Sequence, residues 1–121
     1  MGNSVVHWEI AGPDLAALRD FYAKAFDWTI DDAGEDYCLV RPAGDGLGGG
    51  LMQTRGEMPP YLTVYIAVED LTAALNTIAG LGGTMQVPPT RINESMWFAM
   101  FEDPAGNMVG LLQGEPLDEQ S

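Results

Sequence analysis

The sequence predicts an α+β fold built from two tandem copies of a βαβββ module. Three observations support this prediction: an internal repeat, a helical pattern after each copy of its first segment, and short strand-like runs after each helix. His7–Leu15 aligns with Thr63–Leu71 without a gap, and both segments end in Asp-Leu. Gly50–Gln53 aligns with Gly110–Gln113 at a slightly larger offset, so only the intervening loops need to differ in length. Self-similarity of this kind marks a repeated structural unit.

Each copy contains one amphipathic helix. Asp14 and Asp70 stand where an N-cap side chain accepts hydrogen bonds from free backbone N–H groups. Gly82-Gly83 follows the second helix, as a stop signal does. Apolar residues recur every three or four positions, which is the helical period, at Leu15, Leu18, Tyr22 and Ala25 in the first helix and at Leu71, Ala74 or Leu75, Ile78 and Leu81 in the second.

Strand-like runs separated by turn residues follow each helix. The expected strands are Trp28–Ile30, Tyr37–Arg41 and Gly50–Gln53 in the first copy, and Thr84–Val87, Met96–Glu102 and Met108–Gln113 in the second. The modules thus cover residues 5–55 and 61–113, joined by 56–60 and followed by an acidic tail at 114–121. Neither half is long enough to bury much core alone, so we expect residues 1–121 to form a single domain.

The charge of the chain excludes several classes of partner. Its net charge is −13, from 18 acidic and five basic residues, and such a surface repels nucleic acids and anionic membranes.

No apolar run reaches the roughly 18 residues of a membrane helix. The single cysteine, Cys38, cannot form an intramolecular disulfide, and a cytoplasmic location is the expectation that follows. Cys38 lies in an apolar run and is interpreted as a packed strand residue rather than a nucleophile.

The order of these motifs resembles the vicinal-oxygen-chelate superfamily, which includes glyoxalase I, bleomycin-resistance proteins and extradiol dioxygenases. The resemblance is carried by His7–Asp14 with Phe21-Tyr22, by Thr63–Leu71 with Leu81-Gly82-Gly83, and by Asp103–Asn107 before the last strand. It implies a cupped eight-stranded mixed sheet with helices outside, a deep cleft and a homodimer. In the metal-using members, four side chains from the first and last strands of the two modules hold a divalent ion in that cleft.

Carried over residue by residue, the four ligand positions fall on His7, Thr63, Gly50 and Gly110. One imidazole is present and no carboxylate, whereas catalytic zinc takes about three protein ligands drawn from His, Cys, Asp or Glu. The sequence therefore predicts no metal ion and no other cofactor at this position. The two glycines are expected to leave volume for a roomier, more apolar pocket, unless neighbouring Met, Trp or Phe side chains fill it.

His7 and Glu9 are the candidate catalytic residues. Two residues apart on a strand, they point to one face, which is the cleft if His7 occupies the ligand position. They form either an acid–base couple or a structural ion pair. The same alternation extends the candidate ligand-binding set to His7, Glu9, Gly50, Met52, Thr63, Tyr65, Gly110 and Leu112. Which face of Met96–Phe101 lines the cleft is left open.

Two functions follow, and the sequence leaves open whether the protein is an enzyme. The first is a binding protein that takes a small apolar or aromatic molecule in a metal-free cleft. The second is an enzyme of the lyase, isomerase or hydroxylase kind, which uses acid–base chemistry through His7 and Glu9 or a non-standard metal site. A third interpretation is an interaction module without a ligand.

Overall fold

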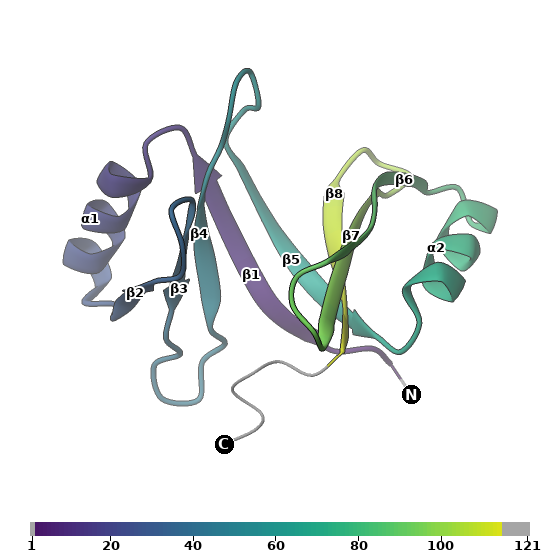
Figure 1. The fold of residues 1–121 in the computed structure, drawn as a ribbon, viewed down its shortest axis with the longest axis horizontal. Helices are drawn as coiled ribbons and strands as arrows, with labels where there is room; N and C mark the ends of the chain where they lie inside the picture. The colour runs from purple at the N-terminus through teal and green to yellow at the C-terminus, as the bar shows by residue number, and fades with distance from the viewer. Residues whose placement is uncertain (1, 115–121) are drawn as a thin grey trace. The chain divides into compact units, whose positions relative to one another are not determined.

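The computed structural model describes residues 2–114, and the acidic residues 115–121 lie outside the described part. It confirms the predicted α+β class: two βαβββ modules contribute eight strands to a mixed sheet (Figure 1). The chain divides into two compact units. We call residues 6–64 the first unit, and residues 2–5 with 65–114 the second unit. That the whole chain acts as a single domain stays a prediction.

Both units follow one strand plan. In the first half the order is β2-β3-β4-β1, with β1 parallel to β4 and the other pairs antiparallel. In the second half the order is β5-β8-β7-β6, with β5 parallel to β8 and the other pairs antiparallel. The elements are β1 (Val5–Gly12), α1 (Leu15–Phe26), β2 (Ile30–Asp32), β3 (Tyr37–Val40), β4 (Gly49–Gln53), β5 (Tyr61–Val68), α2 (Leu71–Gly80), β6 (Thr84–Arg91), β7 (Met96–Glu102) and β8 (Met108–Gly114).

The internal repeat extends to individual hydrogen bonds. The Asp14 carboxylate accepts from the N–H of Ala17 at 3.1 Å, and the Asp70 carboxylate accepts from the N–H of Ala73 at 3.1 Å. Both predicted N-caps are thereby confirmed. The residue after each N-cap is held in the same way: Gln53 Oε1 accepts from the N–H of Leu15, and Gln113 Oε1 accepts from the N–H of Leu71. The side chain of the last strand thus ties down the start of the helix in each module.

Several predicted boundaries were wrong by a few residues. Trp28 precedes β2 instead of opening it, because its indole packs into the helix-side core. β3 ends at Val40, and α2 ends at Gly80 with Leu81 as its C-cap. β6 continues to Arg91 through Pro88 and Pro89. An edge strand tolerates proline, and the register of β6 against β7 shifts on both sides of Val87.

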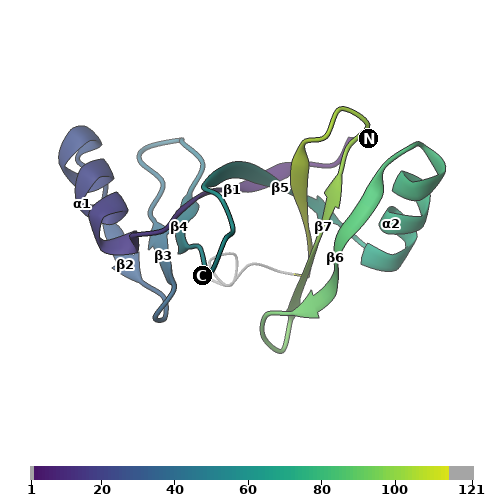
Figure 2. The same cartoon turned by 90° about the horizontal axis from the view of Figure 1, so that it is seen from above.

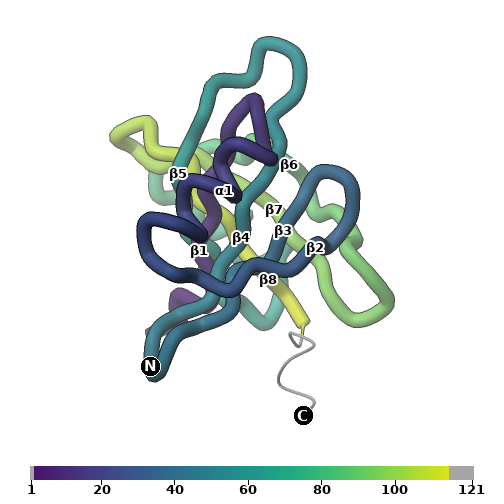
Figure 3. Tube along the Cα trace, turned by 90° about the vertical axis from the view of Figure 1, so that its left-hand side faces the viewer, coloured from purple at the N-terminus to yellow at the C-terminus, as the bar shows by residue number. Residues whose placement is uncertain are grey.

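Each helix covers one face of the strands of its own unit (Figure 2). The core of the first unit contains Ile30, Val40, Leu51 and Cys38, with aromatic side chains packed against it. Cys38 is buried, which confirms it as a packed strand residue, and burial raises the pKa of its thiol. Figure 3 views the first unit from the side of α1, whose apolar face covers this core.

The core of the second unit is aliphatic and lies under α2. It contains Leu71, Leu75, Ala99 and Leu111, with Phe101 packed at its margin. Since alternate residues of a strand share a face, this places the odd-numbered residues of β7 on the helix side and the even-numbered ones on the other side. This answers which residues of Met96–Phe101 point away from the helix, a question that the sequence left open. Within residues 2–114, neither helix has the length and apolar character needed to cross a membrane.

Candidate functional site

A polar cluster lies on the face of the first unit that α1 does not cover. In β1, Trp8 and Ile10 pack toward the helix. His7 and Glu9 alternate with them and therefore point to the opposite face. This is the shared face that the sequence predicted for the pair. Tyr37 from β3 and Tyr61 from β5 meet them there, and we call the four residues His7, Glu9, Tyr37 and Tyr61 the Glu9 cluster.

Glu9 is the centre of the cluster and is only 3% exposed. The Tyr61 hydroxyl donates to Oε2 at 2.6 Å, and the Tyr37 hydroxyl donates to Oε1 at 3.0 Å. Each carboxylate oxygen therefore receives a phenol hydrogen bond. Bonds of this kind to a charged acceptor are stronger than bonds between neutral groups, and they offset part of the cost of burying the carboxylate.

His7 joins the cluster through Tyr37. Its Nε2 lies 2.8 Å from the Tyr37 hydroxyl oxygen. A phenol has one proton, and Tyr37 gives it to Glu9. With this proton used, the hydrogen bond between His7 and Tyr37 forms in the tautomer that carries a proton on Nε2, which then donates to the Tyr37 oxygen. The chain from imidazole to phenol to carboxylate is therefore continuous.

Tyr61 closes the other side of the cluster. Burial raises the pKa of its phenol, and the hydrogen bond to Glu9 raises that pKa further. Both effects favour the neutral phenol, so Tyr61 remains a hydrogen-bond donor over the whole physiological pH range. The sulfur of Met52 lies 3.4 Å from the same hydroxyl. Met52, which the sequence placed in the ligand-binding set, is thus in contact with the cluster.

The metal positions implied by the resemblance do not fit a metal site. Gly50 pairs with Glu9 across β1 and β4, and it has no side chain that could bind a metal. The Tyr37 ring occupies the place that a Cβ atom would take there. His7 is engaged with the Tyr37 hydroxyl, and Thr63 is buried. Among residues 2–114, no group of three or more His, Cys, Asp or Glu side chains is arranged to hold a metal ion.

The prediction that the two glycines leave open volume was wrong. A Cβ atom at Gly110 would clash with the ring of Tyr65, just as one at Gly50 would clash with the ring of Tyr37. A tyrosine ring covers the backbone at each glycine. The glycines are therefore required for close ring-to-backbone contact rather than for a cavity. The sequence left open that Met, Trp or Phe side chains fill this space, and the filling residue is tyrosine in both units.

The predicted ligand-binding residues belong to both units. His7, Glu9, Gly50 and Met52 come together in the first unit around Tyr37 and Tyr61. In the second unit, the buried Tyr65 pairs with Gly110 across β5 and β8, and the buried Leu112 follows two residues later in β8, opposite Ala67. Thr63 is buried in β5 of the first unit.

Tyr37 and Tyr61 were not predicted as members of the site. Tyr61 lies two residues before Thr63, so the period of two that selected Thr63 and Tyr65 would also have selected it. Tyr37 had no such signal. Its place depends on the register of β3 against β4, which sets Tyr37 opposite Met52.

Comparison with known proteins gives a consistent result. The model of the Glyoxalase/Bleomycin resistance protein/Dioxygenase superfamily matches residues 4–111. The candidate glyoxylase CFP32 of Mycobacterium bovis is 30% identical over 108 residues, which cover 83% of this chain and 41% of that protein. The anthracycline biosynthesis protein DnrV of Streptomyces peucetius is 29% identical over 123 residues, with 82% and 42% covered. The chain thus spans about two fifths of the length of these relatives.

Solved structures support the fold. The crystal structure of methylmalonyl-CoA epimerase from Mycobacterium tuberculosis superposes with a TM-score of 0.70 at 15% identity, covering 97% of this chain and 91% of that one. The structure of an NAD-dependent benzaldehyde dehydrogenase from Legionella pneumophila gives a TM-score of 0.68 at 12% identity, covering 90% and 98%. At these identities the likeness concerns the fold alone.

Proposed function

The chain belongs to the Glyoxalase/Bleomycin resistance protein/Dioxygenase superfamily, and we propose that it binds a small apolar or aromatic molecule at the Glu9 cluster without a metal ion. The observation that carries the proposal is the burial of Glu9 beneath aromatic side chains. The carboxylate is buried, whereas His7, Tyr37, Met52 and Tyr61 are each partly exposed. A ligand on this face would contact the aromatic rings and the thioether of Met52, while the Glu9 carboxylate lies buried beneath them.

The hydrogen bonds of the cluster support a binding role. Both phenol hydroxyls are held by Glu9, and the His7 ring is held by Tyr37. Their positions are therefore set before a ligand arrives, so binding costs little side-chain entropy. Apolar surface with a few fixed polar groups is the usual composition of a small-molecule site. The ligand that fits is an aromatic compound with one hydroxyl or carbonyl group.

A titration tests the proposal directly. Neutral aromatic compounds of one to three rings, each with one hydroxyl or carbonyl, would be screened by thermal shift and by NMR of the tyrosine and histidine ring signals. We expect saturable shifts of the Tyr37 and Tyr61 signals, and an affinity at least fivefold weaker in Tyr61→Phe. Glu69→Ala, which changes an exposed acid of the second unit, is the control and should bind normally. Failure of the whole panel to shift these signals would refute the proposal.

A second candidate function is acid–base catalysis at the same cluster. The observation that favours it is the continuous hydrogen-bonded chain from His7 through Tyr37 to Glu9. In such an enzyme, His7 would act as the general base, while Tyr37 and Glu9 would fix its ring and stabilise the imidazolium. One relative is named as a candidate glyoxylase, and that name also favours an enzymatic function.

One variant separates binding from catalysis. A ligand found in the screen would be incubated in D2O with the wild-type protein and with His7→Ala. Deuterium incorporation into the ligand by the wild type alone, with binding retained in His7→Ala, would establish catalysis. Incorporation by neither protein would leave the binding function and remove the enzymatic one.

The proposal extends to assembly and location. We propose a homodimer in the cytoplasm. Size-exclusion chromatography with light scattering should give twice the mass of the chain, and a mass equal to that of one chain would contradict the dimer. Fractionation of cells that produce the full-length protein would test its location.

A further inference from the structure

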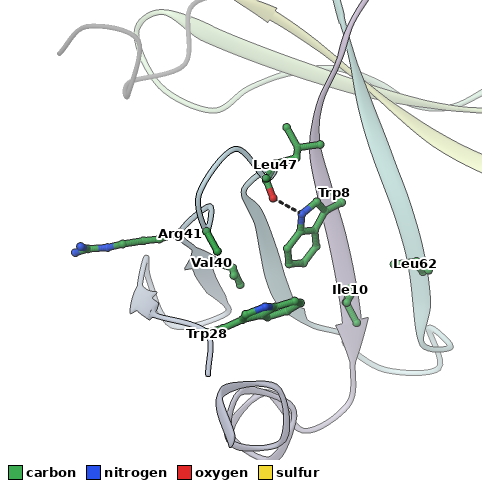
Figure 4. Close-up of a pocket in the computed structure, with 9 residues that line it drawn as sticks. Trp8, Ile10, Trp28, Val40, Arg41, Leu47 and Leu62 are labelled. Carbon is green, nitrogen blue, oxygen red and sulfur yellow. Dashed lines mark hydrogen bonds between the residues drawn. The ribbon is translucent and has the colours of Figure 1, made fainter. Parts of the chain in front are cut away.

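A hollow lies on the opposite face of the first unit, beside α1. It has a volume of about 270 Å³, and its walls include Trp8, Ile10, Trp28, Val40, Leu47 and Leu62 (Figure 4). Trp8 and Glu9 are neighbours in β1, and their side chains point to opposite faces of the strand. The hollow is therefore separate from the Glu9 cluster, and a ligand site there is independent of the proposed function.

Two indole rings form the aromatic wall of the hollow. The centroids of Trp8 and Trp28 are 5.2 Å apart, with 42° between the ring planes. Trp28 is supported from behind by Tyr22, whose ring stacks on it at 5.3 Å and 10°. Trp28 is thus backed by the helix-side aromatic cluster, so it presents a firm surface rather than a mobile side chain.

The position of Trp8 is fixed by two backbone contacts. Its Nε1 donates to the carbonyl oxygen of Leu47 at 2.8 Å, as the dashed line in Figure 4 marks. Its ring also lies against Gly49, where a Cβ atom would clash with the indole. The bond to Leu47 holds the loop between β3 and β4 over the hollow. The pre-set ring and loop reduce the ordering cost of binding.

The charge around the hollow selects a neutral ligand. Arg41 is the charged residue among the described residues that line it, and its side chain extends away from the two indoles in Figure 4. Its Nε donates to Asp31 at 2.6 Å, so the guanidinium is engaged elsewhere. The lining residues thus offer an anion no inward-facing cation, and the net charge of −13 repels one.

The rim of the hollow is apolar and accessible. Leu62 is 72% exposed and Leu47 is 45% exposed. Exposed leucines beside a tryptophan-lined hollow leave apolar surface in contact with water, which a bound ring would remove. A volume of about 270 Å³ lies just below the roughly 300 Å³ at which pockets for drug-sized ligands begin. One or two fused rings therefore fit.

We propose that this hollow is a second ligand site, which takes a neutral, flat aromatic molecule of one or two rings against Trp8 and Trp28. The ring covers the open sides of the two indoles and the apolar rim at Leu62. Aromatic pairs of this kind contribute beyond the area that they bury. The loop carbonyl of Leu47 stays bonded to Trp8, so the ligand needs no polar group of its own.

The test uses 2-naphthol as the probe and the indole N–H signals of the 121-residue chain as the readout. The chain has three tryptophans, and a Trp97→Phe variant identifies the third signal. We expect saturable shifts for Trp8 and Trp28 and none for Trp97. Leu62→Ser should weaken the affinity at least fivefold, whereas Leu81→Ser, which changes a 75% exposed leucine of the second unit, should leave it unchanged.

Charge and face provide two further controls. The anion 2-naphthoate has the same rings and should bind at least tenfold more weakly than 2-naphthol. Tyr37→Phe, which alters the Glu9 cluster on the other face, should not change the midpoint at which the Trp8 and Trp28 signals shift. The proposal is overturned by any of four results: no saturable shift, equal effects of the two leucine variants, equal binding of 2-naphthoate, or shifts that follow protein concentration without the probe. The last result would identify a second copy of the chain as the occupant.

Discussion

At the position where the first unit has Glu9, the second unit has Tyr65, and the glycine opposite each of them is covered by a tyrosine ring. In the second unit the ring belongs to Tyr65 itself. In the first unit it comes from Tyr37 on β3, and its hydroxyl reaches Glu9. The backbone register is the same, but one unit contains a buried charge with two donors and the other a buried ring. A duplicated backbone can thus hold a buried carboxylate in one copy and a buried aromatic ring at the same position of the other.

The helix-side surfaces of the two units also differ, because the side chains of the first unit are larger and more aromatic than those of the second. α1 presents Leu18, Phe21 and Tyr22 where α2, one repeat later, presents Ala74, Thr77 and Ile78. In the first unit Tyr22 stacks on Trp28, and the hollow beside it is aromatic. In the second unit the smaller side chains border a groove of about 540 Å³ with acidic residues at its edge. The hollow of the first unit is therefore lined by aromatic side chains, whereas the groove of the second unit is lined mostly by aliphatic and polar ones.

The largest expected change in stability comes from Glu9→Ala. This substitution leaves two phenol hydroxyls without their acceptor, and each unsatisfied group costs about 1–3 kcal/mol. We expect the free energy of unfolding, measured by urea denaturation, to fall by about 3 kcal/mol. Glu69→Ala, at an exposed acid of the second unit, should leave it nearly unchanged, as surface substitutions do. Equal effects of the two variants would mean that the Glu9 cluster does not stabilise the first unit.

The two covered glycines give the next comparison. A Cβ atom at Gly110 meets Tyr65 at Cγ, Cδ2 and Cε2, close to the root of a buried ring, which cannot move aside. Gly110→Ala should therefore cost about 2 kcal/mol of stability, as overpacking does. The same urea denaturation measures this loss, and a variant as stable as the wild type would contradict the ring-to-backbone contact.

At Gly50 the clash is with the tip of the Tyr37 ring, which can turn outward. Gly50→Ala should cost less stability than Gly110→Ala, but it should move the Tyr37 and His7 ring signals in NMR spectra. Unchanged signals in Gly50→Ala would contradict the close packing of Tyr37 on that glycine.

The pH dependence of stability should report on Tyr61. Its pKa in the folded protein is raised above the value of about 10 that it has when unfolded. The folded protein therefore keeps the phenolic proton at a pH where the unfolded chain has lost it. The stability that this difference in pKa contributes is fully present below about pH 10 and is lost as the pH rises above it. In that alkaline range the melting temperature should fall more steeply in the wild type than in Tyr61→Phe, and parallel curves would contradict the rise in the pKa of Tyr61 that burial and the bond to Glu9 cause.

The smallest expected change in stability concerns the N-cap hydrogen bonds, which the two units share. Asp14→Ala and Asp70→Ala each remove one N-cap hydrogen bond, and each should cost about 1 kcal/mol. We expect the two losses to be equal within experimental error because the caps have the same geometry. A clear inequality, measured in the same denaturation experiment, would show that the helices differ in more than their side-chain cores.

The sequence predicted most of the fold because its signals were local and repeated. The Asp-Leu caps, the helical periods and the paired offsets placed both helices and seven of the eight strands at or near their observed positions. It failed where an element depends on tertiary packing. Trp28 looked like a strand residue but serves the aromatic core, and β6 extends across two prolines because it lies at an edge.

The candidate site was only half predictable. The alternation along β1 was enough to place His7 and Glu9 on one face. The partners that define their chemistry, Tyr37 and Tyr61, come from strands whose register the sequence does not reveal. The same gap explains the error at Gly50, because a glycine in a strand indicates either open space or a close neighbour. Only the register of β3 against β4 distinguishes the two.

The most direct test of metal-free binding at the Glu9 cluster compares the protein before and after exhaustive chelation. One neutral aromatic ligand from the screen would be titrated into both samples, and both would be examined by elemental analysis. Metal-free binding predicts the same affinity and the same Tyr61 signal shift in the two samples, and a loss of both in Glu9→Gln. Stoichiometric metal in the untreated protein, together with loss of ligand binding after chelation, would contradict it.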